Sequence, residues 1–154
     1  MTMFFQFESE FVDSLHCIPM QVRLKLDTCG IKLKLSHWNK FTQEERLTLV
    51  EQTCTTNQEI REYRKLLQKL VLERTGEEAK DMPLDEAPAW LDSKNIPEAV
   101  QEKAGEVGVN LTVEQWADLQ IVQRFALIKL SRSSHENSNF LPALQEFNLV
   151  EHNF

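Results

Sequence analysis

The chain has 154 residues, 42% of them hydrophobic and 27% charged, and a formal net charge of −7 at pH 7. This composition excludes a disordered chain and favours a globular fold that needs neither a metal ion nor disulfides to form its core. We predict no nucleic-acid partner, because phosphate binding needs clustered cations, and no membrane partner, because no apolar run approaches the roughly 20 residues of a spanning helix.

The first eleven residues, MTMFFQFESEF, combine aromatic side chains with Glu8 and Glu10. A signal peptide has basic residues before a longer apolar segment. We therefore expect a cytoplasmic protein whose N-terminus forms a short strand or an extended arm. The cysteines, Cys17, Cys29 and Cys54, form no CxxC pair and have no His at ligand spacing. We interpret them as reduced thiols and predict no metal site.

Residues 18–50 align without a gap to residues 96–128, at an offset of 78 positions. Nine of the 33 aligned positions are identical. Chance matches of residues as rare as Trp, Gly and Pro are improbable, which indicates an internal repeat. The pairs that we assign to the shared scaffold are Pro19/Pro97, Gly30/Gly108, Trp38/Trp116 and Arg46/Arg124.

Each repeat is predicted to begin with a helix of about three turns, since Pro suits the first helical position and Gly the residue after the last turn. A short extended link and a helical turn containing the tryptophan follow. Thr42 with Glu45, and Thr112 with Gln115, are capping-box patterns that indicate helix starts. His37 lies in the first tryptophan turn, and we expect it at the surface.

Residues 57–75 carry apolar side chains at helical spacing up to a glycine, which predicts the longest helix. Residues 76–95 are acidic and contain two prolines, so we expect an irregular connection in which Trp90 packs against the core. Residues 141–150 are predicted to form a last short helix. The sequence therefore predicts an all-α fold of about six helices, in which the two sequence-related halves pack as one compact domain over residues 1–154.

The repeat helps to separate scaffold from site, because a residue kept in both halves serves the folding that both share. We expect the guanidinium groups of Arg46 and Arg124 to stack on the indoles of Trp38 and Trp116, which lie eight residues earlier. The alternative is a pair of anion-binding arginines across a pseudo-twofold axis.

The stretch KLSRSSHENSNFLPALQEF, from Lys129 to Phe147, has no polar counterpart after the first repeat. One interpretation is a loop in which an asparagine caps the next helix. A second is a partner-binding surface with charge-assisted donors and an apolar anchor. A third is catalysis by His135 with Glu136, but no nucleophile or metal ligands accompany them, so we expect no enzyme. The candidate partner-binding residues are Lys129, Arg132, His135, Glu136, Asn137, Asn139 and Phe140.

Three segments resemble a known family: CIPMQVRLKLDTCGIKL, ERTGEEAKDMP and QRFALIKLSRSSHENSNFLPALQEF. Together they resemble the nitrate reductase-associated protein family, known mainly from cyanobacteria, from about Phe5 to Phe147. The resemblance implies a small cytoplasmic accessory protein that active assimilatory nitrate reductase needs. It carries over no catalytic residues.

In cyanobacteria that reductase takes electrons from ferredoxin and contains a molybdopterin cofactor and an iron–sulfur cluster. The resemblance thus implies a maturation factor. Our hypothesis is that it is chaperone-like and binds the apo or immature reductase, and ferredoxin is a second candidate partner. The acidic middle of the chain and the surface from Lys129 to Phe147 are the expected contacts, and no cofactor of its own is expected.

Two alternatives stay open. The first is a binder of a molybdenum cofactor or iron–sulfur intermediate, held through Lys129, Arg132 and His135 or through the three cysteines. The absence of a Gly-rich phosphate loop and the irregular thiol spacing disfavour it. The second is a DNA-binding regulator, but residues 19–41 hold a net charge of only +4, which suits an acidic protein such as ferredoxin equally well.

Overall fold

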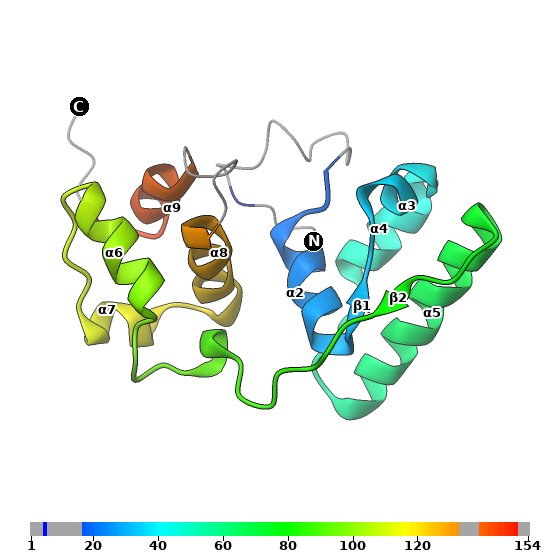
Figure 1. The fold of residues 1–154 in the computed structure, drawn as a ribbon, viewed down its shortest axis with the longest axis horizontal. Coiled ribbons are helices and arrows are strands. Elements are labelled where there is room, and N and C mark those ends of the chain that lie inside the picture. Colours follow the sequence, from blue (N-terminus) through cyan, green and yellow to red (C-terminus); the bar gives the residue numbers. More distant parts are fainter. Residues whose placement is uncertain (1–4, 6–16, 133–138, 151–154) are drawn as a thin grey trace. The chain divides into compact units, whose positions relative to one another are not determined.

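A computed structural model describes Phe5 and residues 17–132 and 139–150 of the chain. Over these residues it contains eight α-helices, one short 3-10 helix and a two-stranded ribbon (Figure 1). The all-α prediction is therefore confirmed, with more helices than the six expected. Within the same ranges, none of the helices has the length and apolar character that crossing a membrane requires.

The described residues divide into two compact units. Unit 1 comprises residues 17–85, and unit 2 comprises Phe5 with residues 86–132 and 139–150. That the whole chain forms one domain stays a prediction. Apart from Phe5, the predicted N-terminal arm lies outside the described residues.

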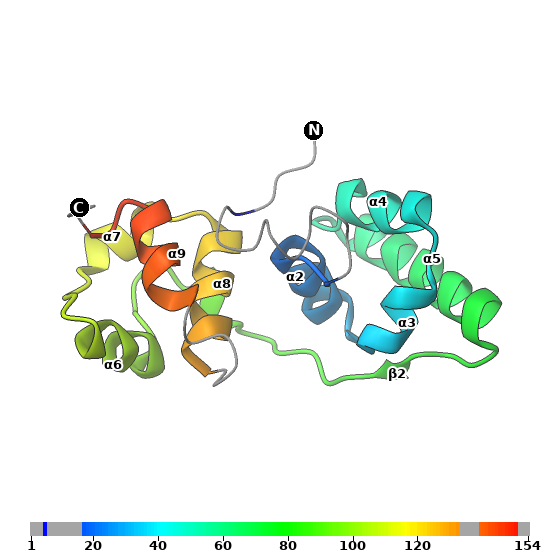
Figure 2. The same cartoon turned by 90° about the horizontal axis from the view of Figure 1, so that it is seen from above.

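Unit 1 is arranged around its longest helix, α5, which contacts α2, α3 and α4 (Figures 1 and 2). The bounds predicted for α5 are confirmed, because Thr56 and Glu59 form a capping box at its start and Gly76 adopts a left-handed conformation at its end. The elements are α2 (Met20–Cys29), β1 (Ile31–Lys32), α3 (Leu35–Lys40), α4 (Gln43–Glu51), α5 (Asn57–Thr75) and β2 (Lys80–Asp81).

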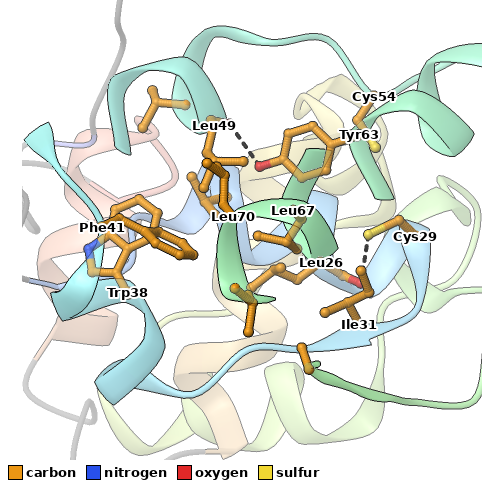
Figure 3. Packing of buried hydrophobic residues seen from close by; sticks show 14 residues of the cluster. Leu26, Cys29, Ile31, Trp38, Phe41, Leu49, Cys54, Tyr63, Leu67 and Leu70 are labelled. Atoms are coloured by element: carbon orange, nitrogen blue, oxygen red, sulfur yellow. Dashed lines mark hydrogen bonds between the residues drawn. The ribbon is translucent and has the colours of Figure 1, made fainter. Parts of the chain in front are cut away.

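The core of unit 1 collects side chains from all four helices and from β1 (Figure 3). Trp38, Tyr63 and Leu67 are fully buried in it. The hydroxyl of Tyr63 donates a hydrogen bond of 2.8 Å to the backbone oxygen of Leu49, so its burial leaves no unsatisfied polar group. Burying a phenol ring of this size contributes roughly 2–3 kcal/mol of hydrophobic stabilisation.

The ribbon of β1 and β2 is an antiparallel pair in which Ile31 lies opposite Asp81 and Lys32 opposite Lys80. The sequence predicted an extended link at β1 but an irregular connection at β2. A strand of two residues has no hydrophobic periodicity, so its pairing could not be predicted. Its position follows from Gln68 of α5, whose carboxamide hydrogen bonds with both backbone groups of Ala79, at 2.9 Å each.

Unit 2 is built around α8, which contacts η2, α6 and α9. Phe125 of α8 is fully buried. The ring of Trp90 meets it edge to face with centroids 5.0 Å apart, which confirms that Trp90 packs against the core. The last helix begins one residue earlier than predicted and is shorter. The elements are η2 (Ala89–Leu91), α6 (Glu98–Glu106), α7 (Val113–Asp118), α8 (Ile121–Arg132) and α9 (Phe140–Glu146).

The helices of the two repeats begin at corresponding positions. α2, α3 and α4 start 78 residues before α6, α7 and α8, and α3 and α7 have the same length. Gly30 and Gly108 both have φ of 77°. The positions of these elements agree with the repeat alignment, whereas a duplication as the origin of the chain stays a prediction.

Each of the paired prolines lies one residue before its helix begins, so neither is the first helical residue. Pro19 and Pro97 were expected as the first helical residues, but each is the N-cap that precedes its helix, with ψ of 156° and 142°. Their φ values of −65° and −57° are those that the proline ring imposes, and they suit an extended N-cap as well as a first helical residue. The sequence therefore located each helix start but not the conformation of its proline.

The two prolines differ in burial. Pro19 is buried, whereas Pro97 is only half-buried. What the pair has in common is a backbone contact, because the carbonyl oxygens of Pro19 and Pro97 accept the first intrahelical N–H groups, from Arg23 at 3.0 Å and from Gln101 at 3.2 Å. Both prolines cap the start of a helix, but Pro97 is less buried than Pro19.

Candidate partner-binding site

The paired arginines hold together the turn that follows each tryptophan helix. Arg46 donates to the backbone oxygens of Trp38 and Asn39 at 3.0 and 2.9 Å. Arg124 donates from one nitrogen to the oxygens of Trp116 and Leu119 at 3.2 and 2.8 Å. These carbonyls lie at a helix end, where the i+4 backbone donors of a helix run out. The oxygens of Trp38 and Trp116 also accept the N–H groups of Phe41 and Leu119, at 3.2 Å each. The guanidinium groups therefore act through the backbone, and the stacking on indole stays a prediction.

Burial distinguishes these arginines from anion-binding ones. Arg46 is 9% exposed and Arg124 is 6% exposed. The Nε of Arg124 also donates to the backbone oxygen of Trp90 at 2.8 Å, and desolvation by burial lowers the pKa of Arg124. The donors point at carbonyl oxygens within the protein, which favours the scaffold interpretation.

Only part of the predicted partner-binding surface lies within the described residues. Arg132 is exposed at the end of α8. The ammonium of Lys129 lies 5.2 Å from the centroid of the Phe125 ring, in a cation–π contact. Asn139 is half-buried before α9, and its side chain makes no capping hydrogen bond, contrary to one of our interpretations. His135, Glu136 and Asn137 lie outside the described residues.

Phe140 corrects the prediction of an exposed apolar anchor. Its side chain is 0% exposed and belongs to the core of unit 2. It begins α9, and α9 contacts α8. The aromatic residue that follows the polar stretch therefore fixes α9 to the unit and is not available to a partner. Among the candidate residues of this site that the structure describes, Arg132 of α8 is exposed.

His37 is buried, and the prediction of a surface histidine is wrong. It is 4% exposed. Its Nδ1 accepts the backbone N–H of Lys34 at 3.3 Å, and its Nε2 lies 3.3 Å from a carboxylate oxygen of Glu77. Because Nδ1 accepts a hydrogen bond, the ring proton is on Nε2, and this N–H donates a hydrogen bond to the carboxylate of Glu77. This hydrogen bond, followed by the charge of Lys34, lowers the pKa of Glu77.

The thiols occupy ordinary packing positions in unit 1. Cys29 and Cys54 are buried, and Cys17 is half-buried. Desolvation by burial raises the pKa of Cys29 to about 12 and that of Cys54 to about 11. Both thiols are protonated at neutral pH, which disfavours them as ligands for iron. Within the described ranges, no group of three His, Cys, Asp or Glu side chains is arranged to hold a metal ion.

Lys25 and Lys103 are identical in the repeat but make different contacts. Lys25 donates to the backbone oxygen of Val50 at 2.6 Å and lies 5.7 Å from the centroid of the Tyr63 ring. It therefore caps the C-terminal end of α4, and desolvation lowers its pKa. α8 continues beyond the corresponding position, and Lys103 instead pairs with Glu106 at 3.1 Å. Identity between the repeats thus does not guarantee a shared role.

A cavity of about 370 Å³ opens in unit 2 between the end of α7, the start of α8 and the segment after α9. Its polar lining consists of four carboxamides, Gln115, Gln120, Gln123 and Asn148, and the carboxylate of Asp118. Among the described residues, no lysine or arginine lines it. An anionic phosphate would meet a like charge there without a compensating cation from these residues, so this cavity does not suit the phosphate of a pterin cofactor.

A model of the family described as conserved nitrate reductase-associated protein matches residues 4–147 of the chain. No curated protein and no solved structure gives a match.

Proposed function

Because the chain belongs to the conserved nitrate reductase-associated protein family, we propose that it is an accessory factor that binds immature nitrate reductase and promotes its maturation. In this proposal it catalyses no reaction. It binds the reductase before the cofactors are inserted and leaves the mature enzyme. The family membership is the observation that carries the proposal.

The interior supports a binding role over a catalytic one. Throughout the described ranges, every buried side-chain nitrogen and oxygen has a hydrogen-bond partner. The buried polar residues, His37, Arg46 and Arg124, hydrogen bond to backbone groups of their own unit. An active site commonly keeps polar groups unpaired for a substrate. We therefore place the function on exposed side chains.

The alternative of direct cofactor handling has less support. Two of the three thiols are buried with raised pKa values, and no cation from the described residues lines the cavity of unit 2. Both features disfavour anionic or iron-containing ligands. An absorbance spectrum and metal analysis after anaerobic purification test this alternative. A coloured, metal-containing protein would support it against our proposal.

A deletion strain tests the proposal in cells. Without the chain, we expect normal amounts of reductase polypeptide but low activity and low molybdenum and iron content per polypeptide. Re-expression of the chain should restore all three. Fully active reductase in the deletion strain would contradict the proposal.

A point substitution then tests whether the exposed end of α8 takes part. Arg132→Ala removes an exposed charge, so we expect the fold to persist and co-purification of the reductase to weaken. Lys94→Ala, an exposed cation elsewhere in unit 2, is the matched control. Equal co-purification with both variants would remove this surface from the proposal without touching the family-based role.

A further inference from the structure

The charges of the chain are unevenly divided. Residues 17–85 contain twelve Lys and Arg against eleven Asp and Glu, whereas residues 86–154 contain five against ten. Unit 1 thus has enough cations to form a basic surface on an acidic protein. Pairing with nearby carboxylates decides which of these cations are available.

Three of these cations form a stripe along α5. Arg61, Lys65 and Lys69 recur every four residues and are all exposed. Residues spaced in this way lie on one face of a helix. The core-facing side of α5 carries Tyr63 and Leu67, so the stripe points away from the core.

The ribbon extends this stripe. Arg64 donates to the backbone oxygens of Cys29 and Gly30 and pairs with Asp81, and Gln68 holds Ala79, so the ribbon is attached along the same helix. Lys80 lies between these two attachment points. We call the surface formed by Arg61, Lys65, Lys69, Lys80 and Lys32 the α5–ribbon face.

Two lysines of this face lie directly opposite each other. Lys32 and Lys80 are a cross-strand pair in the ribbon, and both are exposed. Side chains of directly opposed residues lie on the same side of a sheet, where like charges destabilise the pairing. An anionic group placed between the two ammonium groups would attract both of them and offset their mutual repulsion.

The cations of the α5–ribbon face differ in their ion pairing from their neighbour Arg64, which forms an ion pair with Asp81. Within the part of the chain that the structure describes, none of the five forms a side-chain hydrogen bond or an ion pair. Leu72, close to Lys69 on α5, is 48% exposed and adds an apolar side chain near the stripe. Cations without an ion-pair partner in the protein can attract and orient a partner that has a complementary acidic surface.

We propose that the α5–ribbon face docks a carboxylate-rich surface of a partner protein. A protein fits better than a nucleic acid, because exposed Glu62 and Glu73 lie on the same helix and would repel a phosphate backbone that runs past the face. Glu62 and Glu73 lie three and four residues from Lys65 and Lys69, so they interrupt the positive surface that a long phosphate backbone needs, whereas a discrete acidic patch needs only the cations between them. The inference does not depend on the partner being nitrate reductase.

Titrations of the isotope-labelled full chain, followed by NMR, test the inference with two probes: polyglutamate of about 20 residues and a DNA duplex of about 20 base pairs. At low salt we expect polyglutamate to shift amide signals of α5, β1 and β2. We expect roughly tenfold weaker polyglutamate binding for Lys65→Gln/Lys69→Gln/Lys80→Gln. The control Lys34→Gln/Lys40→Gln/Lys94→Gln loses the same charge outside the face and should bind like the unmodified chain.

Three outcomes overturn the inference. In the first, polyglutamate shifts amide signals outside α5 and the ribbon. In the second, the two triple variants weaken polyglutamate binding equally. The third is DNA binding at the face that is at least as tight as polyglutamate binding, which would assign the face to nucleic acid. If polyglutamate binds as expected but immature reductase does not bind the chain, the proposed function fails and this inference stands.

Discussion

Arg46 donates a hydrogen bond of 3.0 Å from its Nε to the backbone oxygen of Trp38, so a side chain of α4 closes the end of α3. Arg124 repeats this relationship with Trp116 at 3.2 Å. The spacing of eight residues is the same in both, and it allowed the pair to be recognised in the sequence. In each unit this hydrogen bond fixes the second helix and the intervening turn to the end of the first helix.

Replacing Arg124 with Met should destabilise the protein by about 3 kcal/mol, because backbone oxygens of Trp90, Trp116 and Leu119 each lose one hydrogen bond while the volume stays filled. Urea unfolding followed by circular dichroism measures this. Arg61→Met, at an exposed arginine, is the control and should change the free energy of unfolding by less than about 0.5 kcal/mol. Equal effects of the two substitutions would contradict the capping role.

Lys25→Met should cost about 1–2 kcal/mol, since the backbone oxygen of Val50 loses a donor. Lys103→Met should cost less than about 0.5 kcal/mol, because it removes only a pair between residues three apart on α6. Chemical denaturation of the two variants under the same conditions compares them. Equal losses would mean that the shared lysine has one role in both repeats.

Glu59 should contribute to the loss of stability in acid. Hydrogen bonds, first from the hydroxyl of Thr53 and then from the backbone of Thr56, lower its pKa from 4.5 to about 2. The folded state binds this proton less readily than the unfolded state. The stabilisation is therefore complete above pH 4.5 and is lost as the pH falls toward 2.

The comparison of Glu59→Gln with the unmodified chain isolates this contribution. The variant should be less stable at pH 7, and the difference should shrink between pH 4.5 and 2. Glu102→Gln, at an exposed site on α6, serves as the control. A difference that stays constant across this pH range would show that Glu59 does not act through its charge.

The thiols should differ in reactivity. Cys29 and Cys54 are buried with pKa values raised to about 12 and about 11, whereas Cys17 is half-buried. With iodoacetamide at about pH 8, we expect fast alkylation of Cys17 alone in the native protein and of all three thiols in urea. Mass spectrometry of timed samples identifies the sites. Fast native alkylation of Cys54 would contradict its burial.

The sequence contained enough information for the frame of the fold. Thr56, Glu59 and Gly76 mark the ends of α5, because caps act locally and have residue preferences that a sequence displays. The burial of His37 could not be predicted in the same way. It depends on Glu77, forty residues away, and long-range contacts leave no periodic signal.

The candidate site was less predictable than the fold. Phe140 was expected as an exposed anchor because it follows polar residues, but helix α9 turns it into the core. The α5–ribbon face was missed because Lys32 and Lys80 lie far apart in the sequence and meet only through a ribbon of two residues per strand. A count of charges along the sequence does not show that cations from separate segments lie on one surface.

Calorimetric titration of the full chain into purified nitrate reductase, prepared with and without its cofactors, tests the central claim most directly. We predict binding to the cofactor-free enzyme that is at least about tenfold tighter than binding to the mature enzyme. Absence of binding to both forms, or equal affinity for them, would contradict a role in maturation.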